Sequence, residues 1–160
     1  MSGTGRSTPP RLPPRWFIRV FWAGHRAVFR GSGGRVGLSR PKPGRAGLMR
    51  LRTVGRRTGD PRAVMLAYIE DGPNLVTLAM NGWGDAPPAW WLNLQASPEA
   101  TVDLPGEERV VRGRAAQGDE RERLWARYAE LFEGDLDDYA AMRSRETPVV
   151  VFEPAAGGPS

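Results

Sequence analysis

Six short apolar runs, separated by turns that contain glycine or proline, constrain the fold of this chain more than any other feature. The runs cover residues 48–54, 62–69, 75–80, 101–104, 109–116 and 149–152. Asp71-Gly72 and Pro105-Gly106 are dipeptides typical of β-hairpin turns. Strands and helices do not alternate along the chain, so a doubly wound parallel sheet is not expected. The pattern predicts a mainly β domain with peripheral helices, built as a small antiparallel barrel.

Three helices are expected around this barrel. A short helix over 87–96 can begin at its proline pair, because proline pre-sets the first turn. Asp119 is the predicted N-cap of a second helix over 121–132, whose apolar residues recur at helical spacing. A third, acidic helical stretch covers 134–145.

The turn between the first two runs, residues 55–62, has the sequence Gly-Arg-Arg-Thr-Gly-Asp-Pro-Arg. Arginine offers a planar fork of donors that matches phosphate or carboxylate oxygens, and glycine lets backbone N–H groups approach a ligand closely. The turn can therefore bind an anion. It can equally be a solvated basic hairpin, and the motif alone leaves both interpretations open.

Charge is separated along the chain, which carries 23 basic and 18 acidic residues. Residues 1–62 hold 15 basic residues and one acidic residue, whereas the remainder holds 8 basic and 17 acidic. A basic half attracts an anionic cofactor, a polyanion or an acidic lipid surface. With no cysteine and one histidine, disulfides, zinc ribbons, thiol nucleophiles and serine–histidine triads are excluded or nearly so, and no metal site is expected.

The barrel domain is expected to span 48–154, with other kinds of segment on both sides. Residues 1–14 have the composition of a disordered basic tail, 31–47 that of a flexible linker, and 155–160 that of a short disordered tail. Residues 15–30 predict an amphipathic helix with arginines on one face and aromatic residues on the other. Such a helix can lie on an anionic membrane or pack its aromatic face on its own domain. No apolar run is long enough to span a membrane and no signal peptide is recognisable, so a cytoplasmic location is expected.

Five motifs follow one another between residues 48 and 154. They are Leu51-Arg52-Thr53-Val54-Gly55-Arg56-Arg57-Thr58-Gly59-Asp60-Pro61-Arg62, Asp71-Gly72, Ala79-Met80-Asn81-Gly82, Pro88-Ala89-Trp90-Trp91-Leu92-Asn93-Leu94 and Thr147-Pro148-Val149-Val150-Val151-Phe152-Glu153-Pro154. In this order they resemble the deazaflavin-dependent nitroreductase family of actinobacteria. The resemblance implies a split β-barrel related to FMN-binding flavin reductases. It also implies an oxidoreductase that binds the deazaflavin coenzyme F420 and transfers hydride from its reduced form.

The resemblance further implies which residues hold the coenzyme. The arginines of the turn would neutralise its phosphate and polyglutamate tail, while the amides and hydroxyl at Thr58 and Gly59 would hold the phosphate. Residues 78–81 would pass beside the ring system and bond its polar edge through backbone groups. The full predicted set is Arg56, Arg57, Thr58, Gly59, Pro61, Arg62, Leu78, Ala79, Met80, Asn81, Ala89, Trp90 and Asn93.

Two tryptophans follow one another on the predicted short helix. Trp90 and Asn93 lie at i and i+3, on one helix face, so both can reach the same ligand. Neighbouring residues of a helix do not share a face, so one of Trp90 and Trp91 is expected inside and the other outside. The resemblance points Trp90 inward.

The chain departs from the family pattern on the acceptor side. Met80 stands where many relatives carry a smaller residue, and Phe132 and Leu136 occupy two positions that are tyrosines in nitroreductases. Tyr139 matches a third such tyrosine and is the candidate catalytic residue, although a carboxylate of the third helix or solvent could also supply the proton. The expected acceptor is a hydrophobic molecule such as a quinone or a nitroaromatic compound, and the more apolar cover favours the quinone.

Two rival functions are compatible with parts of the sequence. A split-barrel protein can carry flavin mononucleotide, haem or a lipid instead of F420. A basic half with interleaved aromatic residues can also grip nucleic acid, but this interpretation leaves the ordered motifs unexplained, and no nucleic-acid partner is expected.

Overall fold

The computed structural model describes residues 37–80, 86–131, 136–141 and 144–155. Within them the strands are β1 (Gly47–Val54), β2 (Pro61–Asp71), β3 (Asn74–Leu78), β4 (Glu99–Leu104), β5 (Glu107–Ala115) and β6 (Val149–Pro154). The helices of these ranges are α2 (Ala89–Ala96), α3 (Gly118–Ala129) and α4 (Leu136–Ala141).

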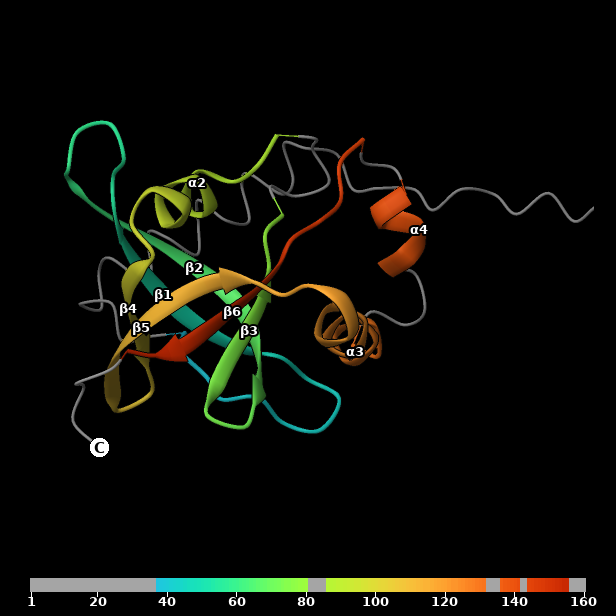
Figure 1. Ribbon diagram of the computed structural model, residues 1–160. Coiled ribbons are helices and arrows are strands. Elements are labelled where there is room, and N and C mark those ends of the chain that lie inside the picture. The colour runs from blue at the N-terminus through green and yellow to red at the C-terminus, as the bar shows by residue number, and fades with distance from the viewer. Residues whose placement is uncertain (1–36, 81–85, 132–135, 142–143, 156–160) are drawn as a thin grey trace, which may run out of the picture. The chain divides into compact units, whose positions relative to one another are not determined.

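All six strands are antiparallel to their neighbours and close into a barrel in the order β1-β2-β3-β6-β5-β4, with β4 paired back onto β1 (Figure 1). Gly72 and Gly106 make the two predicted hairpin turns with φ values of 59° and 74°, a region that glycine enters without steric cost. The structure confirms the predicted fold class, a mainly β barrel with peripheral helices.

Side-chain alternation along the strands builds two apolar cores. One core fills the barrel and includes Leu51, Val102 and Phe152. The other lies between the outer barrel surface and helices α3 and α4, and it includes Val151 and Leu124. Because successive side chains of a strand point to opposite faces, β6 sends Val150 and Phe152 into the first core and Val149 and Val151 into the second.

Helix α2 seals one part of the barrel core. Its residues Trp90, Trp91 and Leu94 belong to the same apolar cluster as the inward side chains of the strands. A Cβ atom at Gly113 of β5 would stand only 3.1 Å from a methyl group of Leu94. Glycine at this position therefore lets the helix approach the strand closely, which seats α2 on the barrel.

Several predicted boundaries need correction. The third strand ends at Leu78 rather than at Met80. Helix α3 begins at Gly118 and its N-cap is Gln117, so Asp119 lies in the first turn and is not the N-cap. That helix also ends at Ala129 instead of 132. Of the acidic stretch 134–145, the described residues form the short helix α4 and bends at 144–145.

The stretch expected to be a linker, 31–47, is in part structured. Ser39 pairs with Leu48 through two backbone hydrogen bonds of 3.0 Å, and Lys42 and Arg45 close a tight turn between them. Gly47 opens β1, and a Cβ there would come within 2.7 Å of the ring of Tyr68. These backbone pairings hold 37–47 to β1, and the barrel domain therefore begins earlier than predicted.

The tail 1–14, the helix 15–30, residues 31–36 of the linker and the tail from 156 onward lie outside the described residues. Among the described helices, none has the length and apolar character needed to cross a bilayer.

Candidate functional site

The strand pairing brings three separate segments to one end of the barrel, which we call the turn end (Figure 1). Val54 pairs with Pro61 where β1 ends and β2 begins, so the turn 55–60 projects there. Because β3 runs antiparallel to β2, it ends at the same side, and α2 leads into β4 from this side as well. Within the described ranges, the predicted coenzyme-binding residues belong to these segments or to their strand ends.

The turn itself has a defined backbone. The Gly55 amide donates to the Asp60 carbonyl at 2.8 Å, and the Gly59 amide donates to the Gly55 carbonyl at 2.8 Å. Gly59 has a φ of 76°, which favours glycine. The Thr58 hydroxyl oxygen accepts from the Asp60 amide at 3.3 Å, so its hydrogen stays available to donate to a ligand.

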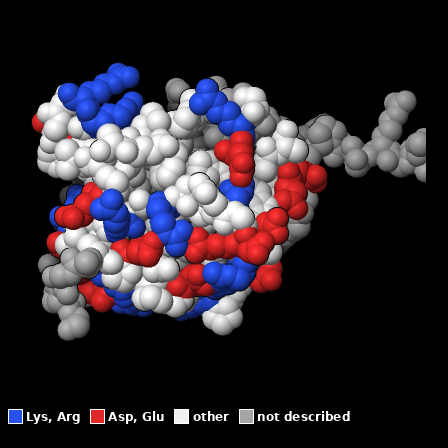
Figure 2. All heavy atoms as spheres, viewed as in Figure 1, with Lys and Arg blue, Asp and Glu red and all other residues white. Residues whose placement is uncertain are grey.

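The arginines of the turn are exposed, and two of them lack the ion pairs that several other arginines of the barrel make. Among the described residues, Arg57 and Arg62 have no ion pair or side-chain hydrogen bond, whereas Arg52, Arg114 and Arg123 are each paired with carboxylates. Figure 2 shows basic side chains gathered at the end where Figure 1 places the turn, apart from the mixed charges below. Two unpaired guanidinium groups, one in the turn and one directly after it, favour an anionic ligand.

The side chain of Asn93, on α2, binds the turn through hydrogen bonds. Its side chain is buried, with 4% exposure. Its carboxamide oxygen accepts from the backbone amide and from the guanidinium of Arg56, each at 3.2 Å. Its carboxamide nitrogen donates to the Thr53 hydroxyl at 3.3 Å. The structure thus ties Asn93 and Arg56 to each other, and Thr53, which the sequence analysis did not single out, completes the contact.

Both tryptophans of α2 are buried, so the expectation of one inner and one outer side chain is wrong. Trp90 and Trp91 are 7% and 8% exposed, and their rings meet edge to face at a centroid distance of 6.3 Å. Trp90 also lies 6.4 Å from the ring of Phe152. The reason is that α2 contacts β1, β2 and β5, so apolar neighbours cover more than one of its faces. Ala89, at its first turn, is exposed.

The ring-side segment leaves the sheet at the turn end. The Met80 amide donates to the Leu78 carbonyl at 3.0 Å, which closes a three-residue γ-turn where the strand ends. The Ala79 amide donates to the Pro148 carbonyl at 3.0 Å. The segment after β3 therefore continues beside the residue that precedes β6. Leu78 and Ala79 are buried and Met80 is half-buried, while Asn81 lies outside the described residues.

Strands β2 and β3 are paired over only part of their length. Their ladder contains three residue pairs, from Asp71↔Asn74 to Ile69↔Val76. Between Ile69 and the turn, β2 has eight more residues, from Pro61 to Tyr68. In the described part of the chain, their edge toward β3 carries no ladder pair. Unpaired backbone groups of a strand edge are ready hydrogen-bonding partners for a ligand. We call this edge, between the turn and the end of β3, the open seam.

The acceptor-side residues fall partly outside the described residues. Leu136 opens α4 and is buried in the second core, and Met80 packs against the same cluster. Tyr139 belongs to α4 by its backbone. Its side chain and the whole of Phe132 are outside the described set.

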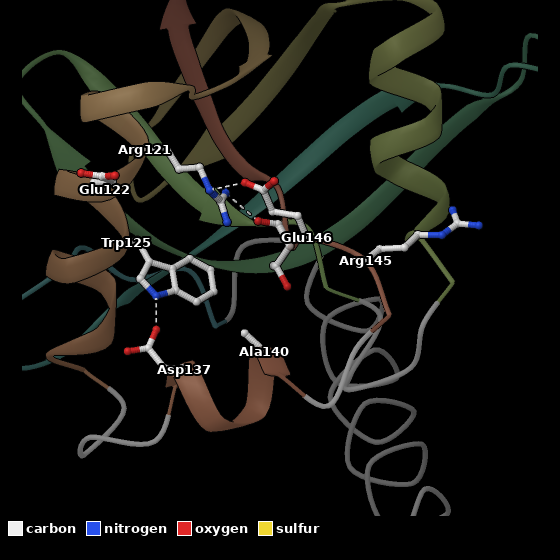
Figure 3. A pocket seen from close by; sticks show the side chains of 8 residues that line it. Arg121, Glu122, Trp125, Asp137, Ala140, Arg145 and Glu146 are labelled. Carbon is white, nitrogen blue, oxygen red and sulfur yellow. Dashed lines mark hydrogen bonds and ion pairs between the residues drawn. The ribbon is translucent and has the colours of Figure 1, made fainter.

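A hollow of about 390 Å³ lies between α3, α4 and residues 145–147 (Figure 3). Its lining consists of Arg121, Glu122, Trp125, Asp137, Ala140, Arg145, Glu146 and Thr147. Arg121 pairs with Glu146 and stands over the Trp125 ring at 5.2 Å, and the Trp125 indole donates to Asp137 at 2.6 Å. These polar groups bond one another, and no predicted coenzyme-binding residue lines the hollow.

Comparison with known proteins settles the family. Residues 22–154 match the family described as F420H(2)-dependent quinone reductase. The chain belongs to this family. Membership makes it an oxidoreductase that uses coenzyme F420, and it confirms the family and cofactor that the ordered motifs predict.

Individual relatives agree with this assignment. A protein named F420H(2)-dependent quinone reductase from Mycobacterium tuberculosis (strain H37Rv) is 31% identical over 130 residues, covering 80% of this chain and 86% of that protein. A solved structure titled F420-H2 dependent reductase (FDR-A) has a TM-score of 0.60 at 25% identity, covering 66% of this chain and 93% of that one. Another, titled a domain-swapped dimer, shares the fold with a TM-score of 0.63 at 24% identity, over 88% of this chain and 100% of that one.

Proposed function

We propose that the turn end of the barrel binds reduced coenzyme F420 and that the protein passes a hydride from it to a quinone-type acceptor. The observation that carries this proposal is the basic turn. Arg57 and Arg62 are exposed and unpaired among the described residues, on a turn that Asn93 holds in place. When bound, the reduced deazaflavin supplies two electrons as a hydride, and a proton from the protein or solvent completes reduction of a quinone to a quinol.

The residues present fit such a coenzyme. Arg57, Arg62 and the Thr58 hydroxyl would bind the anionic tail, with Arg56 tied to α2, while Gly59 leaves room for the approach of phosphate. The backbone of residues 78–81 and the open seam offer hydrogen-bonding groups to the polar edge of a flat ring. On α2, Ala89 and Trp90 would border the coenzyme, and Asn93 would act by fixing the turn.

Binding can be measured directly. The coenzyme is fluorescent, and titration of the purified protein against F420 should quench its emission. Flavin mononucleotide should bind much more weakly, because it lacks the longer anionic tail that three arginines can neutralise. Equal or tighter binding of flavin mononucleotide would overturn the assignment of the site and favour the carrier function. Absorption spectra after mixing with haem test the haem-carrier alternative in the same way.

The acceptor side is proposed to be apolar. Half-buried Met80 packs against the apolar cluster that contains the buried Leu136, and Met80 would give a hydrophobic acceptor a matching wall. Tyr139 on α4 is the proposed catalytic residue, which would donate a proton to the acceptor through its hydroxyl. A Tyr139→Phe variant should then lose turnover while F420 affinity stays unchanged. Unchanged turnover would assign the proton to solvent or to a carboxylate.

We also propose a peripheral contact with anionic membranes through residues 15–30. The support is the sequence pattern, which places arginines opposite aromatic side chains on a helix. Co-sedimentation with anionic vesicles should fall as salt is added, because exposed charges are screened over about 8–10 Å at physiological ionic strength. A protein that begins near Arg45 and still co-sediments would show that this segment is not the anchor.

A further inference from the structure

The backbone carbonyl of Ala67 on β2 accepts hydrogen bonds from two side-chain hydroxyls. The Thr77 hydroxyl, from β3, donates to it at 2.7 Å. The Tyr128 hydroxyl, from α3 on the outer side of the barrel, donates to it at 3.1 Å. Ala67 lies two residues before Ile69, where the ladder between β2 and β3 stops.

These two bonds explain why the ladder stops there. A carbonyl oxygen has two lone pairs, and here both are directed to hydroxyls. Continued pairing of the two strands beyond Ile69↔Val76 would bring Ala67 opposite Leu78. On its other edge β3 stays paired with β6 as far as Leu78↔Val149, so it is only from β2 that β3 separates. The hydroxyls thus take the place of the next ladder bond, and they do so where the strands diverge.

The site of divergence is buried and its donors keep their protons. Thr77 is 2% exposed and Tyr128 is 3% exposed. Burial raises the pKa of Tyr128 to about 12. Its hydroxyl therefore remains a donor at every pH at which the protein is expected to work. Buried hydrogen bonds of this kind define one geometry, because breaking them leaves polar groups without partners.

We propose that Thr77 and Tyr128 are positioning residues. They fix the point where β2 and β3 diverge, which we call the fork, and thereby set the distance between the open seam of β2 and the end of β3. This rests on the proposed function, in which the coenzyme ring lies beside the seam. Neither side chain needs to touch the coenzyme. They act by holding the two strand ends at a spacing that a flat ring can enter.

The test removes each hydroxyl with little change of shape, through Tyr128→Phe and Thr77→Val. Tyr68→Phe is the matched control, because Tyr68 follows Ala67 on β2 and is fully buried. Its hydroxyl has no hydrogen-bond partner among the described residues. We expect Tyr128→Phe and Thr77→Val to weaken F420 binding by about three- to tenfold and to raise the KM for the coenzyme. The KM for menadione should stay unchanged, and Thr77→Ser should restore coenzyme binding.

A second readout does not need the coenzyme. Amide hydrogen exchange should become faster around residues 66–68 and 77–79 in Tyr128→Phe and Thr77→Val, and stay as in the wild type in Tyr68→Phe. Wild-type binding and wild-type exchange in the first two variants would overturn the proposal. If the wild-type protein itself fails to bind F420, the proposed function fails, and the exchange data still decide whether the hydroxyls fix the fork.

Discussion

The carboxamide oxygen of Asn93 accepts two hydrogen bonds from Arg56, one from its backbone amide and one from its guanidinium, each at 3.2 Å. The two residues are 37 positions apart in the chain. The contact joins helix α2 to the basic turn. It engages one of the three arginines and leaves Arg57 and Arg62 for a ligand.

Asn93→Ala should loosen the turn and lower both stability and coenzyme affinity. The substitution leaves the Arg56 amide and the Thr53 hydroxyl without this partner, and an unpaired buried polar group costs about 1–3 kcal/mol. Thermal unfolding and F420 titration measure the two effects. Gln95→Ala, at an exposed position of the same helix, is the control and should change neither. A normal affinity in Asn93→Ala would mean that the turn does not need this support.

Arg57→Ala and Arg62→Ala should each weaken F420 binding by about 1.5–3 kcal/mol, the contribution expected of a charge-assisted hydrogen bond. Because both side chains are exposed and unpaired among the described residues, the melting temperature should barely move. The measurement is the same fluorescence titration, with Arg45→Ala as the control, because this exposed arginine precedes β1 and lies at the end of that strand opposite the turn. If both variants bind like the control, the turn is only a solvated hairpin.

Menadione should be a better acceptor than a bicyclic nitroimidazole. The apolar cluster that includes Leu136 and borders Met80 suits a flat hydrophobic ring. It does not offer hydrogen bonds to the oxygens of a nitro group, and an unpaired buried polar group is costly. Steady-state oxidation of the reduced coenzyme by each compound gives the ratio of kcat/KM values. A higher value for the nitroimidazole would contradict this view of the acceptor side without affecting the family assignment.

Stability should decline in acid partly through Asp71. Two hydrogen bonds from Arg123, at 2.8 and 2.9 Å, hold the pKa of this carboxyl below its ordinary value of 3.8. A carboxyl whose pKa is depressed by folding stabilises the protein above the unfolded-state pKa, and the stabilisation is lost as the pH falls through the folded-state pKa. Asp71→Asn should therefore be less stable than the wild type at neutral pH, and the difference should vanish in acid. Urea unfolding at several pH values measures it, and the effect should be small because Arg123 is exposed and water screens the pair.

Local patterns in the sequence were sufficient to predict the strands. Short apolar runs and hairpin dipeptides placed the six strands to within a few residues, and the ordered motifs identified the family. Local patterns could not give the end of β3. That end depends on the Pro148 carbonyl, which accepts from the Ala79 amide across almost half of the chain.

The site shows the same limit. Helical spacing alone predicted one inner and one outer tryptophan, but Trp91 is buried because neighbouring strands cover α2. Asn93 was predicted from the resemblance and from its helix face, whereas its partners Arg56 and Thr53 could be known only from the fold. One signal was present in the sequence: Thr53 continues the inward positions of β1, where a hydroxyl among apolar residues indicates a polar partner.

The position of β6 has a consequence for how the protein is made. This strand is the last in sequence, yet it lies between β3 and β5 in the closed barrel. Until residues 149–154 leave the ribosome, the five earlier strands can form only an open sheet whose two edges are unpaired. Ala79 would also lack its partner at Pro148, so the ring-side segment cannot take its final path. Residues 149–154 must therefore be synthesised before the coenzyme has a site to enter, and unpaired edges of the nascent sheet are exposed to other strands during that interval.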